Sequence, residues 1–266
     1  MYIIVIPSYQ RANLLKRKTL KTLAEYKIPR SRIYIFVASQ EEKEIYKDTL
    51  DPTTYGHLIV GEKGLKNQRN FISRYFPNDK EILNLDDDLA GFNIIKTHGK
   101  TFNKKDNYLA RLPDLDLFIK QAFKMLKENN AYIWGIYPIN NAYFMTSTTT
   151  FDLRLIVGPC WGNINRQDKD LILTIDEKED VERTLKYYIK DHIVVRFNNI
   201  SVDTSYYVNP GGMQGLGRDR KKDALESAIY LNQKYPDLTQ LNLTKKSGVA
   251  EVKLKDKKIK KNIIIK

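Results

Sequence analysis

The sequence feature that constrains the fold most is an alternation of apolar runs with amphipathic segments over the first 92 residues. Apolar runs of strand length fall at Tyr2–Ile6, Arg32–Ala38, Leu58–Val60 and Glu81–Leu85. Segments with apolar residues at helical spacing lie between them, at Ala12–Tyr26, Glu41–Leu50 and Gly64–Phe76. Strands that alternate with helices of this length predict an α/β fold with a doubly wound, mostly parallel sheet and right-handed crossovers.

The remainder of the chain is less regular. Residues Asn93–Pro113 are polar and are expected to form a loop or an excursion from the main fold. The segment Asn209–Gly217 contains four glycines, so we expect a tight turn or a mobile loop there, in a position suited to a lid. Further helices are predicted at Asp114–Asn129, Lys178–Lys190 and Ala224–Tyr235. Further strands are predicted within Ala131–Met145 and at Leu153–Val157, Ile193–Phe197 and Ser201–Val208.

Three consecutive aspartates, Asp86, Asp87 and Asp88, follow the fourth apolar run. In an open α/β sheet, ligands bind outside the carboxyl ends of the strands, which is where these carboxylates would lie. Adjacent carboxylates raise one another's pKa unless a positive charge lies between them. A hard divalent cation is the economical partner, and it suggests a diphosphate substrate. Taken alone, the triplet is also compatible with a solvated acidic turn, since three adjacent aspartates often occur by chance.

The loop after the first strand carries groups that suit a nucleotide. Ser8, Tyr9 and Arg11 can supply ribose hydrogen bonds, base stacking and phosphate pairing. An ordinary connecting loop is the alternative interpretation of the same residues.

Two predicted helices begin with charged residues. The segment Gly64–Asn70 opens one helix, where Lys66 and Arg69 add positive charge to backbone N–H groups that already attract phosphate. A solvated basic helix face would look the same. The segment Glu177–Asp180 opens a later helix, where acidic residues are stabilised by about 0.3–1 kcal/mol against the helix dipole. Capping alone explains them, but a carboxylate directed into a cleft can also act as a general base.

The positive charge of the chain is concentrated near its C-terminus. The formal net charge is +13, and Lys245–Lys266 carries nine lysines against Glu251 and Asp256. A second basic cluster lies at Arg218–Lys222. Such a distribution favours polyanionic partners and steers them electrostatically, although a basic tail can also serve solubility alone.

Other sequence features point to a cytoplasmic protein without a membrane partner. No apolar run approaches the ~20 residues that span a bilayer, and the N-terminal residues lack the basic region and cleavage site of a signal peptide. The single cysteine, Cys160, excludes an internal disulfide and fits a reducing compartment. We expect it to be a packed residue.

Taken in order, these segments resemble the GT-A family of nucleotide-sugar glycosyltransferases over roughly Met1–Lys190. The resemblance implies a GT-A fold with a glycosyltransferase domain over residues 1–244, in which 1–92 bind the nucleotide sugar and 93–244 the acceptor. A lysine-rich extension would follow over 245–266. The matching elements are the Pro7-Ser8-Tyr9-Gln10-Arg11 turn, the G-x-x-x-x-R-N helix start at Gly64–Asn70, the D-x-D at Asp86–Asp88 and the acidic pair Glu179-Asp180.

The same resemblance implies roles for individual residues. Asp88 would bind Mn²⁺ or Mg²⁺ directly, and Asp86 would contact the ribose or the metal through water. Asp180, or Glu179 if the register differs, would deprotonate the acceptor hydroxyl in an inverting transfer. The donor would be a UDP-sugar, with UDP-glucose as the first choice. Its binding residues would be Pro7, Ser8, Tyr9, Arg11, Lys66, Arg69, Asn70, Asp86 and Asp87.

More narrowly, the chain resembles the TET/JBP-associated glycosyltransferases of phages and eukaryotes, through its compact size, its LNLDDD strand and its basic C-terminus. Members of that group are thought to glucosylate hydroxymethylated pyrimidines in DNA. The resemblance implies double-stranded DNA with modified bases as acceptor and, for a phage protein, the host cytoplasm. The target base would be flipped out, and Trp161 is either its stacking platform or a core residue. Acceptor contacts would come from Trp161, Gly211, Gly212, Arg218, Arg220, Lys221 and Lys222.

The chain departs from the GT-A pattern at its late histidine. Many family members use one as a metal ligand, but His192 falls in a predicted strand and is expected to be a core or edge residue. Other functions stay open at this level. A GT-A enzyme with a protein or polysaccharide acceptor, a nucleotidyltransferase and a non-catalytic nucleic-acid-binding protein on the same scaffold are all compatible with the sequence. Oligomeric state, sugar identity and metal identity are left open.

Overall fold

A central mixed sheet organises the molecule. The computed structural model describes residues 1–99, 104–204, 210–213, 219–243 and 250–255. The eight strands of the main sheet follow the order β3-β2-β1-β4-β9-β7-β10-β8. Strands β3, β2, β1 and β4 are parallel, as are β7 and β10, whereas β9 and β8 run antiparallel to their neighbours. The strands span Ile3–Pro7 (β1), Ile33–Val37 (β2), His57–Val60 (β3), Glu81–Leu85 (β4), Ile133–Ile136 (β7), Thr149–Thr150 (β8), Cys160–Ile164 (β9) and Val195–Phe197 (β10).

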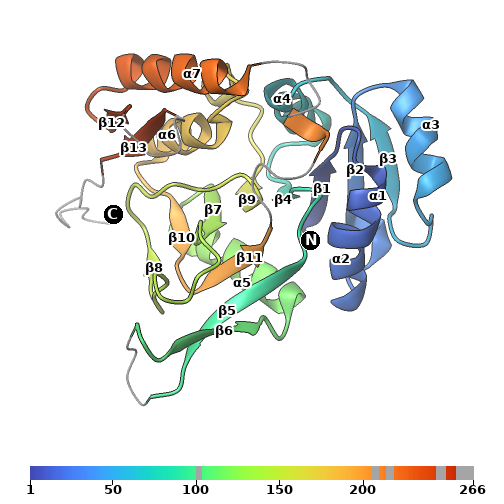
Figure 1. Ribbon diagram of the computed structural model, residues 1–266, viewed down its shortest axis with the longest axis horizontal. Helices are drawn as coiled ribbons and strands as arrows, with labels where there is room; N and C mark the ends of the chain where they lie inside the picture. Colours follow the sequence, from blue (N-terminus) through green and yellow to red (C-terminus); the bar gives the residue numbers. More distant parts are fainter. Residues whose placement is uncertain (100–103, 205–209, 214–218, 244–249, 256–266) are drawn as a thin grey trace.

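Helices cover both faces of this sheet, as Figure 1 shows. The first helix, α1 to α2, packs with α5 against one face, and α4 and α6 pack against the other. This confirms the predicted α/β class and its mostly parallel, doubly wound sheet. The helical segments are α1 (Ala12–Leu15), η1 (Lys16–Leu20), α2 (Lys21–Glu25), η2 (Arg30–Arg32), α3 (Gln40–Thr49), α4 (Leu65–Tyr75), α5 (Leu115–Glu128), η3 (Lys169–Leu171), α6 (Glu179–Asp191) and α7 (Arg220–Lys234).

Side-chain alternation divides the core between the two faces. In β1, Ile4 and Ile6 face the larger cluster with α1, α2 and α5, while Ile3 and Val5 face α4. In β9, Cys160 belongs to the larger cluster and Trp161 to the α6 side. Cys160 is therefore buried, as expected, and burial raises the pKa of its thiol. This period of two is what a strand buried on both faces requires.

The segment predicted as a polar loop, Asn93–Pro113, is the largest difference from the sequence-based expectation. It forms an antiparallel hairpin of β5 (Gly91–Thr97) and β6 (Asn107–Arg111), which pairs with β11 (Ile200–Asp203) in a separate sheet. The hairpin projects away from the main sheet in Figure 1, so most of its residues remain partly exposed and its sequence stays polar. The polar sequence of this segment correctly predicted its exposure, but it did not reveal the two strands.

Two smaller corrections concern strands. The predicted strand Leu153–Val157 is irregular, while β9 lies in the segment that follows it, where no strand was predicted. His192 lies outside any strand: it ends α6 in the left-handed conformation, with φ of 58°, and it is exposed.

The C-terminal part of the described chain packs onto α6. Strands β12 (Thr239–Asn242) and β13 (Glu251–Leu254) form a two-stranded sheet that packs with α7 and α6 around one apolar cluster. Part of the predicted lysine-rich extension is thus a strand of the fold. The stretches 244–249 and 256–266, with most of its lysines, lie outside the described residues. Among the described residues, no helix has the length and apolarity to cross a membrane.

Candidate functional site

The loops that follow β1 and β4 meet at the carboxyl edge of the sheet because these two strands are parallel neighbours. The Ser8 hydroxyl donates a hydrogen bond of 2.6 Å to one oxygen of Asp87, and Nη1 of Arg11 lies 3.2 Å from the other. The predicted nucleotide loop and the predicted acidic loop therefore form one polar cluster.

The three consecutive aspartates have different surroundings. Asp87 is 5% exposed at its side chain and is held by the first loop. Asp88 is buried and accepts a hydrogen bond of 2.8 Å from the Thr204 hydroxyl. The Asp86 side chain is 36% exposed and accepts a hydrogen bond of 3.2 Å from Nη2 of Arg69. Asp86 is thus the most accessible carboxylate of the triplet.

Burial makes the carboxylates of Asp86 and Asp87 hold protons more strongly than usual, so that the pKa of each is raised. Burial by surrounding protein raises the pKa of Asp86 to about 7; Arg69 opposes the rise, and the charges of Asp87 and Asp88 add to it. Burial also raises the pKa of Asp87 to about 6, against the opposing effect of Arg11. A cluster that gains protons near neutral pH would also be stabilised by a bound cation.

A cavity of about 130 Å³ lies directly beside Asp86. It is bounded by the first loop, the start of α4 and the described part of the glycine-rich segment. Seven residues predicted from the sequence line it: Pro7, Ser8, Tyr9, Arg11, Asp86, Asp87 and Gly212. Six others that were not individually predicted as site residues also line it, although four of them lie in the segments Gly64–Asn70 and Asn209–Gly217 singled out from the sequence: Ala38, Glu62, Gly64, Leu65, Gln68 and Met213.

The described part of the glycine-rich segment packs on the first loop. Arg11 donates hydrogen bonds to the carbonyls of Pro210 and Gly211, at 2.9 and 3.1 Å, and the Gly212 amide donates to the Tyr9 carbonyl. Both glycines have positive φ, and a Cβ on Gly212 would lie 2.7 Å from Cζ of Arg11. Glycine is needed there both for backbone conformation and for close approach.

Helix α3 supports the first loop through two residues that the sequence analysis did not single out. Tyr46 is buried, and its hydroxyl lies 2.7 Å from that of Ser8 and accepts from the Arg11 amide. Glu42 accepts hydrogen bonds from the amides of Gln10 and Ala38. The E-x-x-x-Y spacing, which places both side chains on one helix face, was the available signal.

The start of α4 is arranged differently from a simple phosphate site. The Lys66 ammonium donates to the Thr174 carbonyl, and Asn70 exchanges two hydrogen bonds with the Leu173 backbone. Arg69 is 5% exposed and reaches under the sheet edge to Asn84 and Asp86. In this arrangement Arg69 positions Asp86, while Lys66 and Asn70 hold the segment that precedes α6.

The first turn of α6 carries the acidic pair. The Glu179 carboxylate is buried and accepts a hydrogen bond from Arg183, which also donates to the Ile156 carbonyl. The pKa of Asp180 is raised, first by burial and then by the charge of Glu179. A carboxylate with a raised pKa is a better proton acceptor in a reaction near neutral pH, which fits Asp180 better than the ion-paired Glu179.

The residues predicted to contact an acceptor are dispersed. Trp161 is 6% exposed, and the Arg183 guanidinium lies 3.8 Å from its ring centroid. Arg220 pairs with Glu177, while Lys221 and Lys222 are exposed at the start of α7. Arg218 lies outside the described residues.

The carboxylates of Asp86 and Asp88 can hold a divalent cation only if a bound substrate supplies the remaining ligands of the cation. Among the described residues, no group of three or more His, Cys, Asp and Glu side chains gathers in the way that holds a metal. His192 is at the far end of α6 from Asp180, about 18 Å along the helix axis. Asp86 and Asp88 supply hard oxygen donors, so diphosphate oxygens and water would have to provide the rest.

No protein-family model matches the chain, and no curated protein matches it. Among solved structures, TarS 1–349 of S. aureus in complex with UDP has a TM-score of 0.47 and 14% identity, covering 89% of this chain and 72% of that one. A 4-diphosphocytidyl-2C-methyl-D-erythritol synthase from Anaerococcus prevotii has a TM-score of 0.42 and 12% identity, covering 87% of this chain and 96% of that one. The glycosyltransferase GlyE of Streptococcus pneumoniae has a TM-score of 0.21 and 15% identity, covering 48% of this chain and 40% of that one. These similarities are distant, concern the fold and identify no family.

Proposed function

We propose that the protein is a metal-dependent, inverting glycosyltransferase that uses a UDP-sugar, with glucose as the first sugar to test. The observation that supports this most is the carboxylate cluster after β4, which adjoins a cavity built from the β1 loop and the start of α4. In an α/β sheet this edge is where nucleotides bind.

In the proposed reaction, Ser8, Tyr9 and Arg11 hold the nucleotide at the cavity, and Asp86 with Asp88 would hold Mn²⁺ or Mg²⁺. The cation would supply Lewis-acid stabilisation of the leaving diphosphate. Asp180 takes the proton of the acceptor hydroxyl while the hydroxyl oxygen forms a bond to the anomeric carbon of the sugar. The bond from that carbon to the diphosphate breaks, so the configuration inverts.

For the acceptor, we propose a hydroxymethylated pyrimidine in double-stranded DNA. The net charge of +13 and the exposed Lys221 and Lys222 support a polyanionic acceptor. The same donor chemistry with a protein or polysaccharide acceptor is the competing proposal.

The test incubates the protein with Mn²⁺, a panel of UDP-sugars, and DNA with or without hydroxymethylcytosine, followed by mass spectrometry of the nucleosides. A hexose adduct on the modified base alone is the expected result. UDP release without any DNA adduct would reject the DNA acceptor and leave the donor chemistry standing. Absence of both would reject the proposed enzyme.

A further inference from the structure

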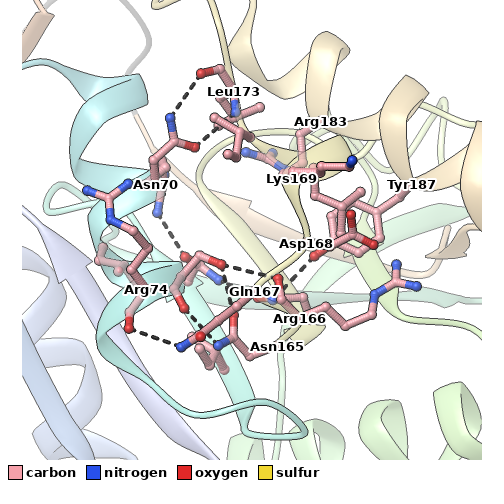
Figure 2. A pocket seen from close by; sticks show the side chains of 18 of the residues that line it. Asn70, Arg74, Asn165, Arg166, Gln167, Asp168, Lys169, Leu173, Arg183 and Tyr187 are labelled. Carbon is pink, nitrogen blue, oxygen red and sulfur yellow. Dashed lines mark hydrogen bonds between the residues drawn. The ribbon is translucent and has the colours of Figure 1, made fainter.

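A second and larger cavity, of about 340 Å³, lies between α4 and α6. Figure 2 shows Asn70 and Arg74 on the α4 side and Arg183 and Tyr187 on the other. The segment 165–173 closes it, and two hydrogen bonds of 2.9 Å between Asn70 and the Leu173 backbone hold that segment in place. Side chains of β4 and β9 form its floor: Ile82, Asn84, Trp161 and Asn163.

Several residues that line this cavity carry a buried hydrogen-bond donor without a partner among the described residues. Nε of Arg69, Nε of Arg183 and Nε1 of Trp161 are buried and have no hydrogen-bond partner among the described residues. These residues are 5%, 3% and 6% exposed, respectively. Nε of Arg166, farther along the same cavity, is in the same situation. Buried donors without acceptors are costly, and several in one cavity indicate a ligand that accepts.

Three of these donors lie close together. The guanidinium carbons of Arg69 and Arg183 are 5.5 and 3.8 Å from the centroid of the Trp161 ring. The outer nitrogens of both arginines are already used: those of Arg69 bond Asn84 and Asp86, and those of Arg183 bond Glu179 and a backbone carbonyl.

Most of the charged side chains that line the cavity are cationic. Five cationic side chains line the cavity, against the single carboxylate of Asp168. Four of them also pair with carboxylates behind the lining: Arg69 with Asp86, Arg74 with Glu62, Arg166 with Asp191 and Arg183 with Glu179. Burial lowers the pKa of Arg69; the charges of Glu179 and Asp86 raise it, and the smaller effect of Arg183 lowers it. The cationic residues are Arg69, Arg74, Arg166, Lys169 and Arg183.

The remaining walls are apolar. Ile72, Ile82 and Leu173 are buried beside the donors, and the ring of Tyr187 adds an aromatic surface. A lining of this composition suits a ligand with an apolar body as well as a charged head.

We propose that this cavity binds a small organic anion, a carboxylate or phosphate carried on an apolar body, whose oxygens accept from Arg69, Arg183 and Trp161. The proposal does not depend on the glycosyltransferase function. It does link the two acidic motifs, because Arg69 also bonds Asp86 and Arg183 also bonds Glu179. A ligand on both arginines would therefore act on the carboxylate geometry of the candidate active site.

The test is isothermal titration calorimetry on the full chain with benzoate and phenyl phosphate, and with neutral benzyl alcohol as comparison. Saturable binding of either anion, at least about tenfold tighter than benzyl alcohol, is expected. The tighter of the two anions identifies the head group. Arg183→Lys and Arg69→Lys keep the charge but remove the Nε donor, and each should weaken binding about tenfold. Arg32→Lys is the matched control, since Arg32 is a partly buried, ion-paired arginine outside this cavity.

Two results would overturn the proposal: no saturable binding of either anion, or binding that both folded variants leave unchanged. Circular dichroism checks the fold of each variant. If a variant fails to fold, crystals of the wild-type protein soaked in 4-bromobenzoate test the site instead. An anomalous bromine peak between α4 and α6 supports the site, and its absence at saturating ligand rejects it.

Discussion

At the scale of single residues, three neighbouring aspartates differ because of what surrounds them. Asp87 is held by Ser8 and Arg11, Asp88 receives the Thr204 hydroxyl, and Asp86 remains partly exposed beside the cavity. The sequence could place the triplet at the end of a strand and suggest a cation. It could not rank the three carboxylates, because the residues that hold Asp87 and Asp88 lie 76 to 116 positions away in the sequence.

The raised pKa values of Asp86 and Asp87 predict a pH dependence of stability. Both pKa values, about 7 and about 6, exceed the value of about 3.9 expected in the unfolded chain. The folded state therefore binds more protons, and the contribution is fully present below about pH 4 and is lost as pH rises through 6 to 7. Without metal, the melting temperature should fall over this window, and Asp86→Asn should flatten the fall. Parallel profiles for variant and wild type, measured by scanning calorimetry, would contradict it.

Gly212 offers a test of how the glycine-rich segment meets the first loop. Alanine there would adopt a φ of 58° and place Cβ 2.7 Å from Cζ of Arg11. We expect Gly212→Ala to cost about 1–2 kcal/mol and to weaken nucleotide binding, because Arg11 must move. Gly91→Ala is the control, since its Cβ meets nothing within 4 Å. Chemical denaturation and UDP titration measure both effects; equal behaviour of the two variants would be inconsistent with this packing.

At the scale of elements, the alternating first half of the chain was predictable and the second half was less so. Strands β1, β2 and β4 carry apolar runs because both of their faces are largely buried. The β5–β6 hairpin was not predicted because its exposed strands carry polar residues. Strand β9 was not predicted because Gly162 and Asn163 interrupt the apolar pattern of a buried strand. A Cβ on Gly162 would meet the Trp134 ring, a contact that no local pattern reveals.

Helix α6 depends on an internal ion pair at its start. Removing one partner of the buried Arg183–Glu179 pair leaves an uncompensated charge, which typically costs about 3–5 kcal/mol. We therefore expect Arg183→Met to be strongly destabilised, and Arg183→Met with Glu179→Gln to recover much of the loss. Urea denaturation of the three proteins measures this. A double variant no more stable than Arg183→Met would argue against the pair as the cause.

At the scale of the whole molecule, the basic balance of the chain bears on the acceptor. The segment 256–266 carries five lysines and one aspartate. If DNA is the acceptor, deleting it should weaken DNA binding and reduce the slope of log affinity against log salt by up to about 4. UDP binding should stay unchanged, because the candidate site is built from other residues. Fluorescence anisotropy at several salt concentrations gives the slope, and an unchanged slope would remove this segment from the DNA interface.

The most direct test of the proposed donor chemistry is calorimetric titration of UDP into the protein with and without Mn²⁺. The account predicts saturable binding that requires the cation and is lost in Asp86→Asn, while Asp48→Asn, at an exposed helix position, binds as wild type does. Binding that ignores the cation and survives Asp86→Asn, or no binding at all, would contradict the placement of a UDP-sugar at this cluster.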